Sequence, residues 1–104
     1  MLVELRCYTF RPGTLARFLE AYEREALDLH RRHLGRLLGY FTTDSGELNQ
    51  VVHLWGFSDH ADRAARRAAL YADPVWLAFL ERTAADVLRM EARFLSPTAF
   101  SPIR

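Results

Sequence analysis

The stretch that decides the fold is Leu48–Phe57, which reads LNQVVHLWGF. Its β-branched, aromatic and aliphatic residues are typical of a strand. Because successive side chains of a strand point to opposite faces, His53 and Trp55 share one face while Val52 and Leu54 share the other. Neither face is polar enough to lie in water, so we expect a second layer on each side of the sheet that contains this strand.

Strands and helices alternate around this stretch in a definite order. Runs of β-forming residues between turn signals predict further strands at residues 2–10, 37–43 and 87–95, with a tight turn at 44–47. Helical spacing of apolar residues predicts helices at 14–33, from a Ser58 cap to Ala72, and from an Asp73–Pro74 start to Thr83. The order β-α-β-β-α-β, with an extra short helix, predicts a ferredoxin-like α+β fold with a four-stranded antiparallel sheet and helices on one face.

The composition predicts one globular domain spanning residues 1–104, with an extended tail at 95–104. Fourteen basic residues, all arginine, are interleaved with thirteen acidic ones, so we expect no nucleic-acid partner, and the absence of lysine excludes Schiff-base chemistry. Cys7 is the only cysteine, which favours a reducing compartment, and the cytoplasm is the simplest expectation. No apolar run approaches the length of a membrane span and the N-terminus does not resemble a signal peptide, so we expect no membrane partner.

The uncovered face of the sheet predicts a homodimer. The expected cover is the same sheet in a second copy, joined by two-fold symmetry as a dimeric α+β barrel. The tail carries Phe100 between prolines, cannot continue an inner strand, and is predicted to pack across the partner subunit. Association beyond the dimer stays open.

The middle of the chain resembles the NIPSNAP family. Gly39-Tyr40-Phe41 followed by Gly46-Glu47-Leu48-Asn49-Gln50-Val51-Val52-His53-Leu54-Trp55 is similar to the family's hairpin and third strand. Flanking pieces agree in order and spacing: Glu4-Leu5-Arg6 with Tyr8, Pro12-Gly13, Arg63 with Arg66 and Arg67, Asp73-Pro74 with Trp76, and Phe100-Ser101-Pro102.

This resemblance implies a dimeric α+β barrel and little chemistry. Animal relatives are mitochondrial and are linked with vesicle traffic and mitophagy signalling, a role that we do not carry over to this chain. Other α+β barrel families include cofactor-free monooxygenases, haem-degrading enzymes and isomerases, so the architecture alone supplies only an analogy for function.

His53 is the main candidate for chemistry. It shares a strand face with Asn49 and Trp55 in an otherwise apolar segment, where a polar residue needs a partner. As an acid or base it would lie near Tyr8, Tyr40 and Trp76, aromatic groups able to sandwich a flat ligand. The alternative is a buried histidine hydrogen-bonded to the surrounding structure.

Arginines on the first and last strands offer two interpretations. Cross-strand ion pairs are expected between Glu4 or Arg6 on the first strand and Arg89, Glu91 or Arg93 on the last. Alternatively, Arg6 holds a carboxylate or enolate at the mouth of a cleft.

The remaining candidates have ordinary structural interpretations. His30 and His33 lie three apart, but two arginines between them favour solvated or helix-end histidines over a metal site, so no metal is expected. Small residues on the second helix predict close packing on the sheet, and arginines on that helix predict a solvated face. The small residues are Ala61, Ala64, Ala65, Ala68 and Ala69, and the arginines are Arg63, Arg66 and Arg67.

Three functions follow from these residues. The first is a barrel that binds a small aromatic or anionic molecule in a cleft between helices and sheet, without a cofactor, through Arg6, Tyr8, Tyr40, Asn49, Trp55 and Trp76. The second is a cofactor-independent monooxygenase or isomerase that uses His53 as acid or base. The third is a structural or interaction module, and whether the protein is an enzyme stays open.

Overall fold

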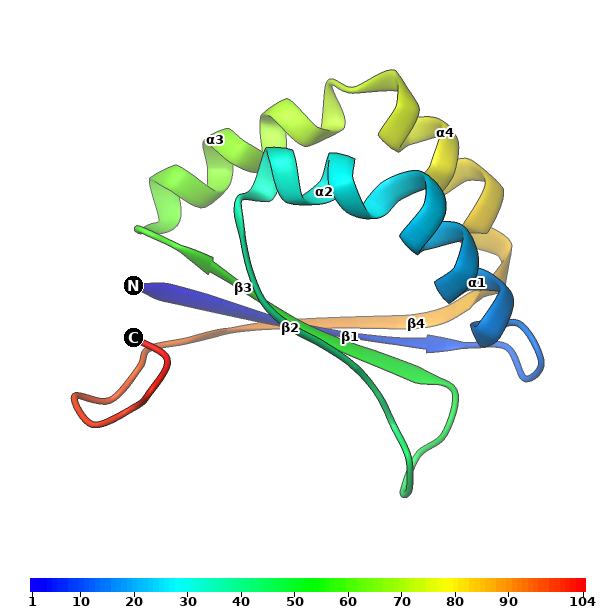
Figure 1. Cartoon of the computed structure of the whole chain (residues 1–104), viewed down its shortest axis with the longest axis horizontal. Helices are drawn as coiled ribbons and strands as arrows, with labels where there is room; N and C mark the ends of the chain where they lie inside the picture. Colours follow the sequence, from blue (N-terminus) through cyan, green and yellow to red (C-terminus); the bar gives the residue numbers. More distant parts are fainter.

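Four antiparallel strands form one sheet with every helix on one face of it, in a computed structural model that describes residues 1–104 (Figure 1). The strands lie in the order β2-β3-β1-β4, with bounds β1 Leu2–Phe10, β2 Arg36–Thr42, β3 Gln50–Phe57 and β4 Val87–Leu95. The helices are α1 Leu15–Ala21, η1 Tyr22–Ala26, α2 Leu27–Leu34, α3 His60–Tyr71, α4 Pro74–Thr83 and the short η2 Ala84–Asp86. The ferredoxin-like α+β prediction is confirmed. None of the helices is long and apolar enough to cross a membrane.

The pairing of β3 with both neighbours decides which side chains share the helix-covered face. His53 lies opposite Arg6 of β1 and opposite Tyr40 of β2. Residues directly opposite one another in an antiparallel pair project to the same face. Arg6, His53 and Tyr40 therefore form a row across the sheet beneath the helices, and Glu4 and Trp55 form part of the next row.

The first long helix contains a π-helical turn at Tyr22–Ala26, between α1 and α2. A π turn accommodates one extra residue, and such turns are frequent at functional sites. At about 100° per residue, positions eight apart on a regular α-helix differ by about 80°, and one extra residue reduces this to roughly 20°. Tyr22 and His30 therefore project from nearly the same side. The helix ends at Gly35, whose φ of 89° favours glycine.

The orientation of α3 is the reverse of the prediction, in which its alanines pack on the sheet and its arginines face solvent. The five alanines are exposed, whereas Arg63, Arg66, Arg67 and Leu70 form the stripe turned inward. The reason is that the sheet beneath this end of the helix offers the buried carboxylate of Glu4, which an arginine can reach and an alanine cannot. The cap also differs from the prediction, because the side chain of Asp59, not that of Ser58, accepts a hydrogen bond from the Asp62 N–H at 2.8 Å.

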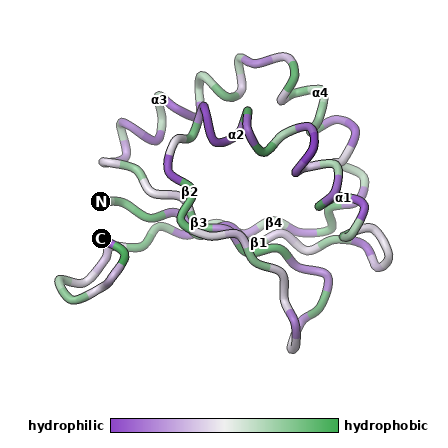
Figure 2. Tube along the Cα trace, in the orientation of Figure 1, coloured by the Kyte–Doolittle hydropathy of each residue, from purple (hydrophilic) through white to green (hydrophobic).

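The opposite face of the sheet has no helix over it (Figures 1 and 2). Leu5, Cys7, Val52 and Leu54 lie on this face and are half-buried, and Phe41 of β2 is 57% exposed. The tail after β4 folds back near the N-terminus, with Phe100 86% exposed. An apolar surface of this extent is typical of an interface.

Candidate functional site

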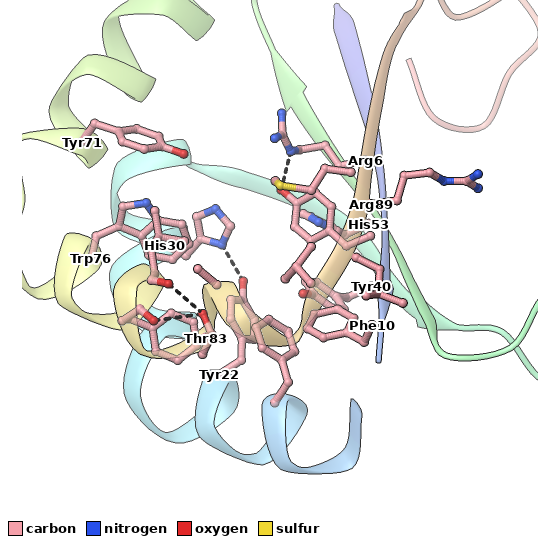
Figure 3. Close-up of a pocket in the computed structure, with 18 of the residues that line it drawn as sticks. Arg6, Phe10, Tyr22, His30, Tyr40, His53, Tyr71, Trp76, Thr83 and Arg89 are labelled. Atoms are coloured by element: carbon pink, nitrogen blue, oxygen red, sulfur yellow. Dashed lines mark hydrogen bonds between the residues drawn. The ribbon is translucent and has the colours of Figure 1, made fainter. Parts of the chain in front are cut away.

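A cavity of about 510 Å³ lies between the helix-covered face of the sheet and the helices α1 to α4 (Figure 3). Its volume falls within the range of small-molecule sites. Eight tyrosine, phenylalanine and tryptophan side chains line it, among them Tyr8, Tyr40, Tyr71 and Trp76, together with His30 and His53. The walls therefore suit a flat, largely apolar molecule.

The charged groups of the cavity are all of one sign. The side chains of Arg6 and Arg67 line it, and no aspartate or glutamate does, whereas the Arg89 side chain points away from the cavity toward Glu47 and Glu91 (Figure 3). Arg6 donates from Nε to the Tyr8 hydroxyl at 2.6 Å, and Arg67 lies over the Tyr71 ring at 5.1 Å. The cavity is thus electropositive at its wall and favours an anion over a cation.

His53 is held in one protonation form by its neighbour on β3. The indole Nε1 of Trp55, which can only donate, lies 2.7 Å from Nδ1 of His53. The neutral ring must therefore carry its proton on Nε2. Burial, and secondarily the charge of Arg6, lowers the pKa of His53 to about 3, so the ring is neutral near pH 7. The Nε2 atom is buried and has no hydrogen-bond partner.

His30 is the cavity residue that the sequence interpretation missed. It is 5% exposed, so the expectation of a solvated helix-end histidine is wrong. Its ring stacks on Trp76 at a centroid distance of 4.4 Å and lies 4.5 Å from the Trp55 ring. The sequence does contain a signal for its burial, because His30 lies four residues after Ala26 on the apolar face of the helix. The two arginines that follow His30 obscured this signal.

A short hydrogen bond joins His30 to the π-helical turn. The Tyr22 hydroxyl lies 2.6 Å from Nδ1 of His30 and has no other partner. Burial raises the pKa of Tyr22, so the phenol keeps its proton, and that proton has only Nδ1 as an acceptor. Burial, together with the proximity of His53, lowers the pKa of His30 to about 3. His30 therefore repeats the arrangement at His53, with Nδ1 accepting a hydrogen bond and the proton on Nε2.

Most of the predicted ligand-binding residues meet at this cavity. Arg6, Tyr8, Tyr40, His53 and Trp76 all line it. His53 stacks on Tyr40 at 4.6 Å and meets the edge of Tyr8 at 5.0 Å. Trp76 also has a buried, unpartnered Nε1.

Two of the predicted residues lie elsewhere. Trp55 is fully buried behind the cavity wall, where it donates to His53 and lies against the ring of His30. Asn49 is in the loop before β3 with a φ of 63°, and its backbone carbonyl accepts from the Phe10 N–H at 2.8 Å. The strand begins at Gln50, so Asn49 does not share a strand face with His53.

The expected ion pairs between the first and last strands are not formed. Glu4 and Arg6 lie opposite Phe94 and Ala92, so Arg89, Glu91 and Arg93 project to the other face of the sheet. Glu4 instead accepts on Oε2 from Arg63 at 2.8 and 3.2 Å and from Arg6 at 3.2 Å. Arg89 lies near Glu47 and Glu91 at 3.6 and 3.3 Å. His33, the other candidate for a helix-end histidine, lies 2.9 Å from a carboxylate oxygen of Asp73 at the start of α4.

Solved structures share the fold of this chain over nearly its whole length. A NIPSNAP family protein from Agrobacterium tumefaciens is 42% identical, with a TM-score of 0.96 over 99% of this chain and 98% of that one. An uncharacterized NIPSNAP domain protein from Burkholderia xenovorans is 43% identical, with a TM-score of 0.93 over 98% and 99%. A putative antibiotic biosynthesis monooxygenase from Nitrosomonas europaea, 13% identical with a TM-score of 0.68 over 93% and 98%, shares the fold alone.

Curated relatives and a family model give the same family. Protein NipSnap homolog 3B of Homo sapiens is 33% identical over 103 residues, which are 97% of this chain and 41% of that protein. The homolog of Dictyostelium discoideum is 31% identical over 94 residues, 90% of this chain and 41% of that protein. The chain thus spans about two-fifths or less of the length of these and other curated relatives that it matches. The NIPSNAP family model matches residues 3–102, and the chain belongs to the NIPSNAP family.

Proposed function

We propose that the protein binds a small, flat molecule with aromatic or anionic character in the cavity between its helices and its sheet. The observation that carries this proposal is the lining of the cavity, in which aromatic rings and the side chains of Arg6 and Arg67 occur without any acidic residue. A closed apolar core would not place arginine guanidinium groups and unpartnered ring N–H groups around one space of this size.

Filling the cavity tests the proposal. Ala84 lines the cavity and Ala64 lies on the exposed face of α3, so Ala84→Trp and Ala64→Trp form a matched pair. With 1-anilinonaphthalene-8-sulfonate as a flat anionic probe, we expect saturable binding to the native protein and to Ala64→Trp, and at least tenfold weaker binding to Ala84→Trp. Native mass spectrometry of the freshly purified proteins would show a retained ligand in the same two. Equal probe affinity in all three proteins would sink the proposal.

The open face of the sheet supports a homodimer as the state in which the protein binds. It is apolar through Leu5, Val52 and Leu54 and has no cover within the chain. A charge at its centre, Leu54→Glu, should give monomers in sedimentation velocity, whereas Leu77→Glu on the outer side of α4 should leave the dimer intact. Truncation after Leu95 should weaken the dimer if the tail packs across the partner subunit. A monomeric native protein would contradict this part of the proposal.

Catalysis by His53 stays a prediction, as does a cytoplasmic location. Because Nδ1 is held by Trp55, the unpartnered Nε2 carries the proton, so His53 would act as a hydrogen-bond donor and not as a base, and only after a rearrangement that exposes this buried atom. The monooxygenase relatives share only the fold and do not add a reaction.

A further inference from the structure

We propose that His30 is a ligand-binding residue that donates a hydrogen bond from Nε2 to an oxyanion carried by a planar aromatic ligand, and that Tyr22 is the positioning residue that fixes the donating form of the ring. This inference rests on the proposed function, since it names the polar group that the cavity selects. It concerns a histidine that lies on the helical layer, opposite the strand histidine His53.

Geometry places the free nitrogen of His30 at the cavity. The ring lines the cavity, and its one hydrogen bond is the contact of Nδ1 with Tyr22. Nε2 of His53 and Nε1 of Trp76 are sealed from solvent without partners, whereas Nε2 of His30 is not sealed in this way. Of the three ring N–H groups that lack an acceptor, that of His30 is therefore the one that an incoming ligand reaches without a rearrangement.

The π-helical turn is what makes the Tyr22 contact possible. Without its extra residue, Tyr22 and His30 would diverge by about 80° around the helix axis. With it, the hydroxyl reaches Nδ1 at 2.6 Å (Figure 3). The rings of Trp55 and Trp76 then hold the plane of the imidazole. The result is a preorganised donor, whose orientation costs nothing further when a ligand binds.

The other groups at the cavity decide the class of ligand. An oxyanion finds the Nε2–H of His30 and the guanidinium groups of Arg6 and Arg67. An ammonium group would meet the same two arginines and no carboxylate, and an unsubstituted ring would leave the donor of His30 without an acceptor. The aromatic walls accept the ring of all three kinds of ligand, so the charged oxygen of the ligand determines which one binds most tightly.

A set of naphthalene compounds separates the contribution of the oxyanion from that of the ring. The probes are 2-naphthoate, 2-naphthol, 2-methylnaphthalene and 2-naphthylmethylammonium, measured by quenching of tryptophan fluorescence, since both tryptophans of the chain contact His30. We expect 2-naphthoate to bind at least tenfold more tightly than the ammonium compound. A phenol-selective site would instead rank 2-naphthol first, and tighter binding as the pH approaches ionisation of 2-naphthol would assign a phenolate as the preferred oxyanion.

Variants of His30 and Tyr22 assign the donor. His30→Phe should weaken the binding of 2-naphthoate about tenfold and leave the binding of 2-methylnaphthalene unchanged. His30→Gln keeps an N–H near the Nε2 position and should therefore restore much of the lost affinity for 2-naphthoate. Tyr22→Phe should shift part of the His30 population to the Nδ1–H form in long-range ¹H–¹⁵N spectra and weaken 2-naphthoate only. His60→Phe, on the exposed start of α3, is the matched control and should change neither affinity.

The outcomes separate this inference from the proposed function. If His30→Phe weakens 2-naphthoate and 2-methylnaphthalene equally, or if the ammonium compound binds as tightly as 2-naphthoate, the cavity binds ligands but His30 does not select an oxyanion. If none of the four compounds binds the native protein while 1-anilinonaphthalene-8-sulfonate does, the inference about His30 is also overturned. If no aromatic probe binds, the proposed function itself fails.

Discussion

The helix-covered face of the sheet has two ends that differ in how their hydrogen-bond donors are partnered. At one end, the closed end, the fully buried Glu4 accepts on Oε2 from Arg63 and Arg6, so the cations there have an acceptor, while Glu4 Oε1 has no partner. At the other end, the cavity end, the ring N–H groups of His53 and Trp76 have no acceptor within the chain. The closed end pairs its donors within the chain, whereas the cavity end leaves the Nε2–H of His30 for a molecule that is not part of the chain.

The largest effect should come from breaking the closed end. Glu4→Gln removes the carboxylate with which Arg63 forms its ion pair and leaves a partly buried cation without that counter-charge. We expect the free energy of unfolding to fall by about 3–5 kcal/mol, measured by urea denaturation. Glu47→Gln, at an exposed site, should change it by less than about 0.5 kcal/mol. A loss below about 1 kcal/mol for Glu4→Gln would mean that the two ends do not differ.

Acidification should destabilise the protein through the two histidines at the cavity. The folded-state pKa values of His30 and His53 are lowered to about 3, below the unfolded value of about 6.5, so the unfolded state binds more protons between these limits. Stability is therefore fully present above pH 6.5 and is lost as the pH falls through this window.

Between pH 6.5 and 5, protonation of the two histidines in the unfolded state should lower the free energy of unfolding by roughly 3 kcal/mol in total. Urea denaturation at a series of pH values measures this, and His53→Phe should reduce the slope by about half relative to the native protein. A flat profile down to pH 5 would contradict the neutral, buried state of both rings.

The two tryptophans of the chain give a direct comparison within the cavity end. Trp55→Phe removes the donor to His53 and should cost about 2–3 kcal/mol, from the lost hydrogen bond and the lost volume. Trp76→Phe removes an N–H that has no acceptor, so its cost should be smaller. Equal losses in urea denaturation would show that the hydrogen bond from Trp55 contributes nothing.

The smallest expected effect lies at the start of α3, the helix that carries Arg63. Asp59→Ala removes the N-cap acceptor of the Asp62 N–H and should lower the free energy of unfolding by about 1 kcal/mol. Ser45→Ala in the exposed loop between β2 and β3 is the control and should have no measurable effect. A loss as large as that of Glu4→Gln would show that the position of Arg63 depends on this cap.

The sheet and most of its helix-covered face could be predicted from the sequence because strand periodicity is a local property. The alternation in β3 placed His53 correctly, and the order of elements placed Arg6, Tyr8 and Tyr40 beside it. Asp73 and Pro74 marked the start of α4 through capping chemistry that operates within one turn.

What sequence reasoning missed depends on contacts between distant segments. The alanines of α3 face outward because Arg63 finds Glu4, a partner 59 residues away, and helical spacing alone does not say which face meets the sheet. The π-helical turn has no sequence signature that we could use, so the pairing of Tyr22 with His30 was not foreseen. The adjacent arginines made His30 look solvated although its ring lies between two tryptophans.

One measurement tests the central claim most directly: long-range ¹H–¹⁵N spectra of the four histidines near pH 7, recorded as 2-naphthoate is added. The account predicts that His30 and His53 are both neutral with the proton on Nε2, and that ligand binding shifts the Nε2 resonance of His30 more than those of His33 and His60. A His30 ring that is charged, protonated on Nδ1, or unaffected by saturating ligand would contradict it.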